Sequence, residues 1–99
     1  MKIKVQSIHF DADQKLIDFI EGKIEKLTHY YDQIMDTEVF LRLDNSETHE
    51  NKIAEIKIHT PGKTLFAKEQ CKTFEAATDS AVDALRKQIT KHKEKQNGE

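Results

Sequence analysis

Basic side chains gather near the C-terminal end of the chain in a spacing that could bind phosphate. Five of the twelve residues from Ala84 to Lys95 are basic, and one, Glu94, is acidic. The five are Arg86, Lys87, Lys91, Lys93 and Lys95. A helix over this segment would place most of them opposite its apolar side, with Arg86 and Lys93 flanking that side at one edge. Such a surface could bind a phosphate backbone and displace its counterions, which would make binding strongly dependent on salt.

A second set of cations lies on an earlier segment that also has helical spacing. Lys23 and Lys26, together with Lys15, follow one margin of its apolar residues, whereas its carboxylates fall on the far side. If that margin faces the C-terminal helix, the two helices present a continuous basic surface, to which Thr90 could add a hydroxyl donor for phosphate. A purely solvated surface is the alternative, because the helix dipole alone favours cations in the last turns of a helix.

No set of residues in the sequence is typical of a catalytic or metal site. The five histidines lack the paired spacing of metal ligands, and the three glycines are isolated, so there is no glycine-rich phosphate loop. The single cysteine, Cys71, cannot form an internal disulfide and is expected to be a small buried hydrophobe. We therefore expect no enzymatic activity, no metal and no cofactor. Tyr30 keeps two interpretations, since its ring could stack on a base or cover the edge of a sheet.

Hydrophobic periodicity predicts the elements that must position these residues. Apolar residues alternate with polar ones over 2–8, 39–44, 54–59 and 65–71, which is typical of strands. Apolar residues recur three and four positions apart over 14–31 and 73–95, which is typical of amphipathic helices. Asp11 or Asp13 could cap the first helix, and Pro61 with Gly62 fits a type II turn. The predicted fold class is α+β, a β-α-β-β-β-α two-layer sandwich with a four-stranded sheet and both helices packed on one face.

Length and composition favour a single domain over residues 1–99, ordered over about 1–95 and frayed over 96–99. The chain is 36% hydrophobic and 34% charged, which leaves enough apolar residues for one core. No apolar run approaches the roughly 20 residues that cross a bilayer, and no signal peptide opens the chain. We therefore expect a cytoplasmic protein with no membrane partner. The net charge is −2, but acids predominate from Asp36 to Glu55, a region that could dock a basic protein.

Two segments of the sequence resemble the ribosome hibernation-promoting factors and the related ribosome-associated inhibitor A. Residues 85–93, Leu-Arg-Lys-Gln-Ile-Thr-Lys-His-Lys, are similar to that family's Leu-x-Arg-Gln-Leu-x-Lys-His-Lys signature. Residues 23–27, Lys-Ile-Glu-Lys-Leu, followed by Tyr30-Tyr31-Asp32, are similar to its Lys-Phe-x-Lys-Leu-x-x-Tyr-Phe-Asp motif. The likeness extends over essentially the whole chain, in the same order of elements.

The resemblance implies a fold similar to double-stranded RNA-binding domains and a function in translation. Members of the family bind the small ribosomal subunit between head and body, where they overlap the sites of messenger and transfer RNA. By position, the contacts to ribosomal RNA would come from Lys23, Lys26, Arg86, Lys87, Lys91, Lys93 and Lys95. This chain would then be a translation inhibitor that keeps idle ribosomes intact in stationary phase or under stress, reading RNA mainly by shape and backbone.

Departures from the family pattern bear on these expectations. Lys87 stands where relatives carry Arg, which keeps the charge but loses bidentate phosphate geometry, and Glu75 stands where members often carry Tyr. The resemblance is to the short form, because the chain ends at Glu99. We expect a monomeric free protein, and a helper protein for any ribosome dimerisation. The alternatives are a general double-stranded RNA-binding domain that uses the same face and a small protein-interaction module that uses the acidic region.

Overall fold

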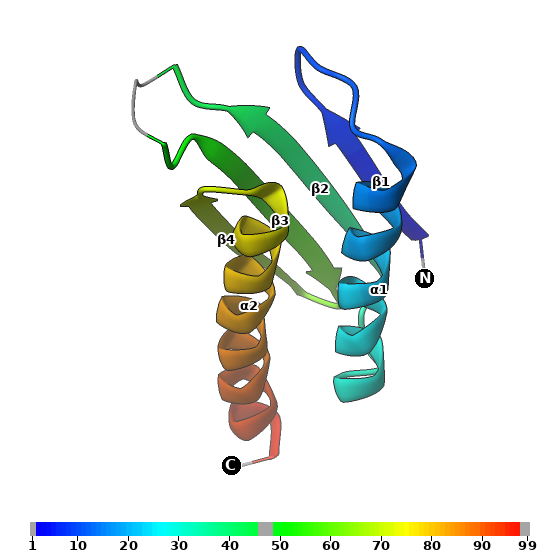
Figure 1. Cartoon of the computed structure of the whole chain (residues 1–99). Helices are drawn as coiled ribbons and strands as arrows, with labels where there is room; N and C mark the ends of the chain where they lie inside the picture. Colours follow the sequence, from blue (N-terminus) through cyan, green and yellow to red (C-terminus); the bar gives the residue numbers. More distant parts are fainter. Residues whose placement is uncertain (1, 46–48, 98–99) are drawn as a thin grey trace.

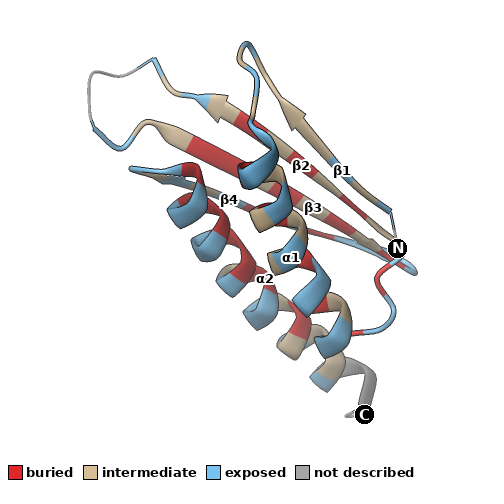
Figure 2. Ribbon diagram, turned by 45° about the vertical axis from the view of Figure 1, so that its right-hand side comes forward, coloured by how far each residue is buried: buried red, intermediate tan, exposed pale blue. Residues whose placement is uncertain are grey.

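Four strands and two helices follow one another in the predicted order. The structure, a computed structural model, describes residues 2–45 and 49–97. Its elements are β1 (Lys2–Ser7), α1 (Gln14–Tyr30), β2 (Asp36–Leu43), β3 (Lys52–Thr60), β4 (Lys63–Cys71) and α2 (Phe74–Asn97). Both helices lie on one face of the sheet and run side by side in the same direction (Figure 1), and Figure 2 shows the same arrangement from a second side. The predicted two-layer α+β fold is confirmed.

The sheet has the strand order β1-β2-β3-β4, with β1 parallel to β2 and the other pairs antiparallel. One row of apolar residues crosses all four strands in register: Val5, Val39, Ile56 and Ala67. Because side chains alternate along a strand, this row and its neighbours two positions away form the face that the helices cover. Gly62, in the turn between β3 and β4, has a φ of +79°, as position three of a type II turn requires.

Each helix buries one apolar stripe against that face of the sheet. The buried residues of helices and strands are coloured red in Figure 2. The buried residues of α1 are Leu16, Ile20, Ile24 and Leu27, and those of α2 include Phe74, Ala77, Ala81, Val82, Leu85 and Ile89. Of the two predicted caps of α1, Asp13 is the one that acts: its Oδ1 accepts the Leu16 N–H at 2.8 Å. Thr73 caps α2, since its Oγ1 accepts the Ala76 N–H at 3.0 Å.

The boundaries of all six elements differ from those expected, each by one to three residues. Helix α1 ends at Tyr30, and Tyr31 becomes its buried cap residue, donating its N–H to the Leu27 carbonyl at 2.8 Å. Strand β2 begins at Asp36, before its first apolar residue. Helix α2 continues through Asn97, although fraying was predicted from 96 onward, and residues 98–99 lie outside those described. Over the described residues, neither helix combines the length and apolarity needed to span a bilayer.

Candidate nucleic-acid interface

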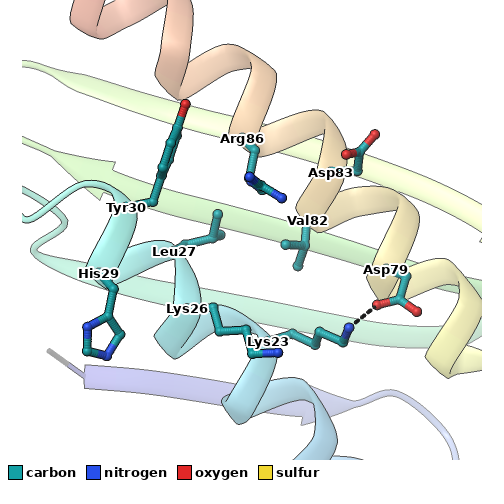
Figure 3. Close-up of a pocket in the computed structure, with 9 residues that line it drawn as sticks. All are labelled: Lys23, Lys26, Leu27, His29, Tyr30, Asp79, Val82, Asp83 and Arg86. Atoms are coloured by element: carbon teal, nitrogen blue, oxygen red, sulfur yellow. Dashed lines mark ion pairs between the residues drawn. The ribbon is translucent and has the colours of Figure 1, made fainter.

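A groove of about 610 Å³ lies between α1 and α2. Figure 3 shows its lining, in which Leu27 and Val82 supply apolar surface and the other side chains are polar or charged. The lining residues are Lys23, Lys26, Leu27, His29, Tyr30, Asp79, Val82, Asp83 and Arg86. The groove therefore holds three of the seven cations that sequence reasoning assigned to RNA.

Helical spacing explains why these side chains meet. On α1, Lys23, Lys26 and Tyr30 stand three and four residues apart, so they share the margin of the buried stripe that faces α2. On α2, Arg86 and Lys93 stand seven residues apart, close to two helical turns, and both reach toward the end of α1. The predicted placement of the basic margin of α1 toward α2 is thus correct for Lys23 and Lys26.

The Tyr30 ring is the centre of a cluster at the C-terminal end of α1. The guanidinium carbon of Arg86 lies 5.4 Å from the ring centroid, and Lys93 Nζ lies 4.8 Å from it. Lys93 also donates to the Tyr30 main-chain carbonyl at 3.3 Å, so it satisfies an acceptor that the helix end leaves open. These are cation–π and hydrogen-bond contacts between helices, and neither open interpretation of Tyr30 anticipated them.

A chain of hydroxyl groups ties the same ring to α2. Thr90 Oγ1 donates to the Arg86 carbonyl at 2.9 Å, and the Tyr30 hydroxyl is hydrogen-bonded to that Thr90 oxygen. A carbonyl only accepts, so the single Thr90 proton goes to Arg86 and the Tyr30 hydroxyl donates to Thr90. Thr90 has no proton left for a phosphate, and its expected role as an auxiliary donor is wrong in this arrangement.

Two aspartates of α2 interrupt the basic surface at the other end of the groove. Asp79 Oδ1 lies 2.9 Å from Lys23 Nζ, the ion pair drawn as a dashed line in Figure 3. Asp83 lies 3.4 Å from Lys87 Nζ, and both side chains of that pair are mostly exposed. The expectation of a continuous basic surface is therefore wrong. Sequence reasoning followed the acids of α1 and overlooked those of α2, although Asp79 and Asp83 share helical spacing with Arg86.

Four of the predicted cations stay clear of carboxylates. Within residues 2–45 and 49–97, none of the four forms an ion pair with Asp or Glu. We call them the four unpaired cations: Lys26, Arg86, Lys91 and Lys93. Lys26, Arg86 and Lys91 are exposed, and Lys93 is half-buried against Tyr30. Lys95 belongs to α2, but its side chain lies outside the described part.

The described acids of the region from Asp36 to Glu55 are distributed over two strands and the connection between them. Some of these acids lie on β2 and β3, where Glu55 pairs with Arg42 and the His59 ring lies 3.4 Å from a Glu38 oxygen, and the others lie in the connection between the two strands. Glu47, which falls in the same region, lies outside the described residues. No three His, Cys, Asp or Glu side chains gather into a possible metal site in the part of the chain that is described. Cys71 packs against the core but is only partly buried, whereas a buried side chain was expected.

The fold and this groove define a small α+β domain that presents cations from two adjacent helices. The family model described as Sigma 54 modulation protein / S30EA ribosomal protein matches residues 3–97. The chain therefore belongs to that family, which confirms the resemblance seen in the two sequence motifs.

Individual relatives agree with this assignment. The chain is 31% identical to a ribosome hibernation promoting factor of Azotobacter vinelandii, over 97% of this chain and 86% of that protein. It is 28% identical to the factor of the same name from Escherichia coli K12, over 96% of each.

Solved structures share the fold. The N-terminal domain of Thermus thermophilus Protein Y superposes with a TM-score of 0.79 at 28% identity, covering 93% of this chain and 99% of that one. A ribosomal subunit interface protein from Coxiella burnetii superposes with a TM-score of 0.83 at 20% identity, covering 94% and 98%.

Proposed function

We propose that this protein is a ribosome hibernation factor that inhibits translation without catalysis. It binds the small ribosomal subunit in the cytoplasm and occupies the sites of messenger and transfer RNA during stationary phase or stress. The observation that carries the proposal is the set of four unpaired cations on two adjacent helices, in a chain whose relatives are named ribosome hibernation promoting factors. Pairing of two ribosomes would require a helper protein.

The chemistry of the groove side suits a phosphate backbone. Lys26 and Arg86 line the groove from opposite helices, so a backbone seated along it meets a cation on each wall. Arg86 has no ion-pair partner among the described residues, and its N–H groups are available for the bidentate contacts that guanidinium makes with phosphate. Ribosomal RNA read in this way is recognised by backbone and shape rather than by base sequence.

In the complex with RNA, Lys23 and Lys87 contact phosphates in place of the aspartates with which they pair in the free protein. Each is paired with an exposed aspartate, and although Lys23 itself is half-buried, such solvent-accessible ion pairs contribute at most about 1 kcal/mol, so a phosphate can compete for each lysine. Together with Lys95, they complete the seven cations proposed to contact RNA.

Co-sedimentation with ribosomes through sucrose tests the proposal. The variant is Arg86→Glu, Lys87→Glu and Lys91→Glu together; the matched control reverses Lys4, Lys63 and Lys72, which are exposed and do not line the groove. The first variant should be absent from the ribosomal fractions, whereas the control should sediment with the ribosomes. Both should melt close to the wild type, because the six side chains lie outside the core. If the variant at Arg86, Lys87 and Lys91 still sedimented with ribosomes, the proposed RNA-binding site would be refuted.

A general duplex-RNA binder would use the same cations, and competition distinguishes it. A free RNA duplex added in molar excess over ribosomes should leave a ribosome-specific factor bound. Displacement of the protein at duplex concentrations comparable to those of the ribosomes would favour the general binder.

A further inference from the structure

Tyr30 lies at the surface, at the C-terminal end of α1, and yet it contacts several residues of α2. Its ring meets Arg86 and Lys93, its hydroxyl meets Thr90, and its carbonyl accepts from Lys93. Its side chain nevertheless borders the groove and is 37% exposed, so the cluster faces solvent rather than the core.

We propose that Tyr30 is a positioning residue that holds Arg86 and Lys93 in place to contact RNA phosphates. The inference rests on the proposed function and adds a residue that carries no charge. A cation–π contact arises from the attraction between the ring face and the cation, so it leaves the N–H groups of the cation free to donate. Arg86 therefore keeps its donors, and Lys93 keeps two of its three after the bond to the Tyr30 carbonyl.

Hydrogen bonds to α2 fix the orientation of the Tyr30 ring relative to Arg86. The hydrogen bonds run from the Tyr30 hydroxyl to Thr90 and from Thr90 to the Arg86 carbonyl. The ring thus cannot move away from Arg86 without breaking its hydrogen bond to Thr90, whose hydroxyl is bonded to the Arg86 carbonyl.

This arrangement orders two flexible side chains before RNA arrives. Long side chains lose rotamer freedom when they bind, and two cations brought together also repel each other. The Tyr30 ring and carbonyl offset both costs in the free protein. Without the ring, the loss of rotamer freedom and the repulsion between the cations both reduce the free energy of binding. For two such side chains this corresponds to about a tenfold loss of affinity.

The salt dependence of ribosome binding distinguishes positioning from direct contact. Tyr30→Leu should weaken binding about tenfold and leave the slope of log K against log salt unchanged, because no phosphate contact is lost. Arg86→Gln should make that slope shallower by about 0.9. Tyr30→Phe, which keeps the ring, should restore most of the affinity, and Phe66→Leu, an exposed aromatic on β4, serves as the matched control. Wild-type affinity in Tyr30→Leu would overturn the inference.

A double-mutant cycle adds a second criterion. In a background of Arg86→Gln with Lys93→Gln, the Tyr30→Leu change should have no further effect on affinity, because its action passes through those two side chains. A further tenfold loss in that background would mean that the ring itself stacks on RNA, which contradicts a positioning role.

NMR of the free protein tests the cluster without ribosomes. The side-chain protons of Arg86 and Lys93 should show upfield ring-current shifts that persist in Tyr30→Phe and vanish in Tyr30→Leu. Absence of these shifts in the wild type would overturn the inference whatever the ribosome assay gives. Their presence in a wild-type protein that fails to sediment with ribosomes would refute the proposed function and remove the RNA ligand assigned to the pair.

Discussion

Removing the two aspartates beside the groove should strengthen binding to RNA. Asp79→Asn releases Lys23, and Asp83→Asn releases Lys87, so neither lysine has to leave a carboxylate before it contacts a phosphate. At about 0.9 per contact, the seven proposed phosphate contacts give a salt slope of about −6.3 in both proteins. The variant should bind up to about 30-fold more tightly, because two ion pairs of at most about 1 kcal/mol each no longer have to break. Lost stability should stay below about 2 kcal/mol, because both ion pairs are solvent-accessible.

The assay is ribosome binding at 50, 100 and 200 mM KCl with constant magnesium. Over this range both proteins should lose about 6,000-fold in affinity, with the variant binding more tightly at each salt concentration. The control is Glu21→Gln with Glu25→Gln, which neutralises two acids on the side of α1 opposite Lys23. Equal affinities of the wild type and the aspartate variant would refute the idea that these acids occupy RNA-binding cations.

Three further substitutions test the packing that positions the groove, each by urea denaturation. Gly22→Ala should raise the free energy of unfolding by about 1 kcal/mol, because Gly22 is exposed inside α1 and an added Cβ meets no atom within 4 Å; no gain would contradict the helical assignment there. Thr78→Val should raise it by about 1 kcal/mol, since the Thr78 hydroxyl is fully buried without a hydrogen-bond partner among the described residues; a loss would show that the hydroxyl is satisfied. Asp13→Ala should lower it by about 1 kcal/mol through loss of the bond to the Leu16 N–H, and Asp11→Ala, its control, should have little effect.

The fold was predictable because periodicity and burial agree along most of the chain. Val39 and Leu41 alternate with Phe40 and Arg42, and the structure buries the first pair while leaving the second half-buried on the open face. The start of β2 was missed because Asp36 and Glu38 are polar and Thr37, although buried, carries no hydrophobic signal. Strand pairing with β1 and β3 draws these residues into the sheet against their local pattern.

The candidate site was predictable in its residue types and faces but not in its pairings. Spacing along one helix shows that Arg86 and Lys93 share an edge, whereas their contacts with Tyr30 depend on the distance between helices. Lys23 and Asp79 are likewise far apart in sequence, and only the packing of α1 beside α2 brings them to 2.9 Å. A periodic pattern describes each helix alone, so it cannot distinguish a cation that faces solvent from one that faces a carboxylate.

Site-specific photo-crosslinking to the ribosome tests most directly whether the groove between the helices faces RNA. A photoreactive residue at His29, which lines the groove, is compared with one at Thr64, which is exposed on β4. The account predicts cross-links from His29 to RNA of the small subunit, mapped by primer extension. Cross-links from Thr64 without any from His29 would show that the opposite face of the sheet meets the RNA, and would contradict the account.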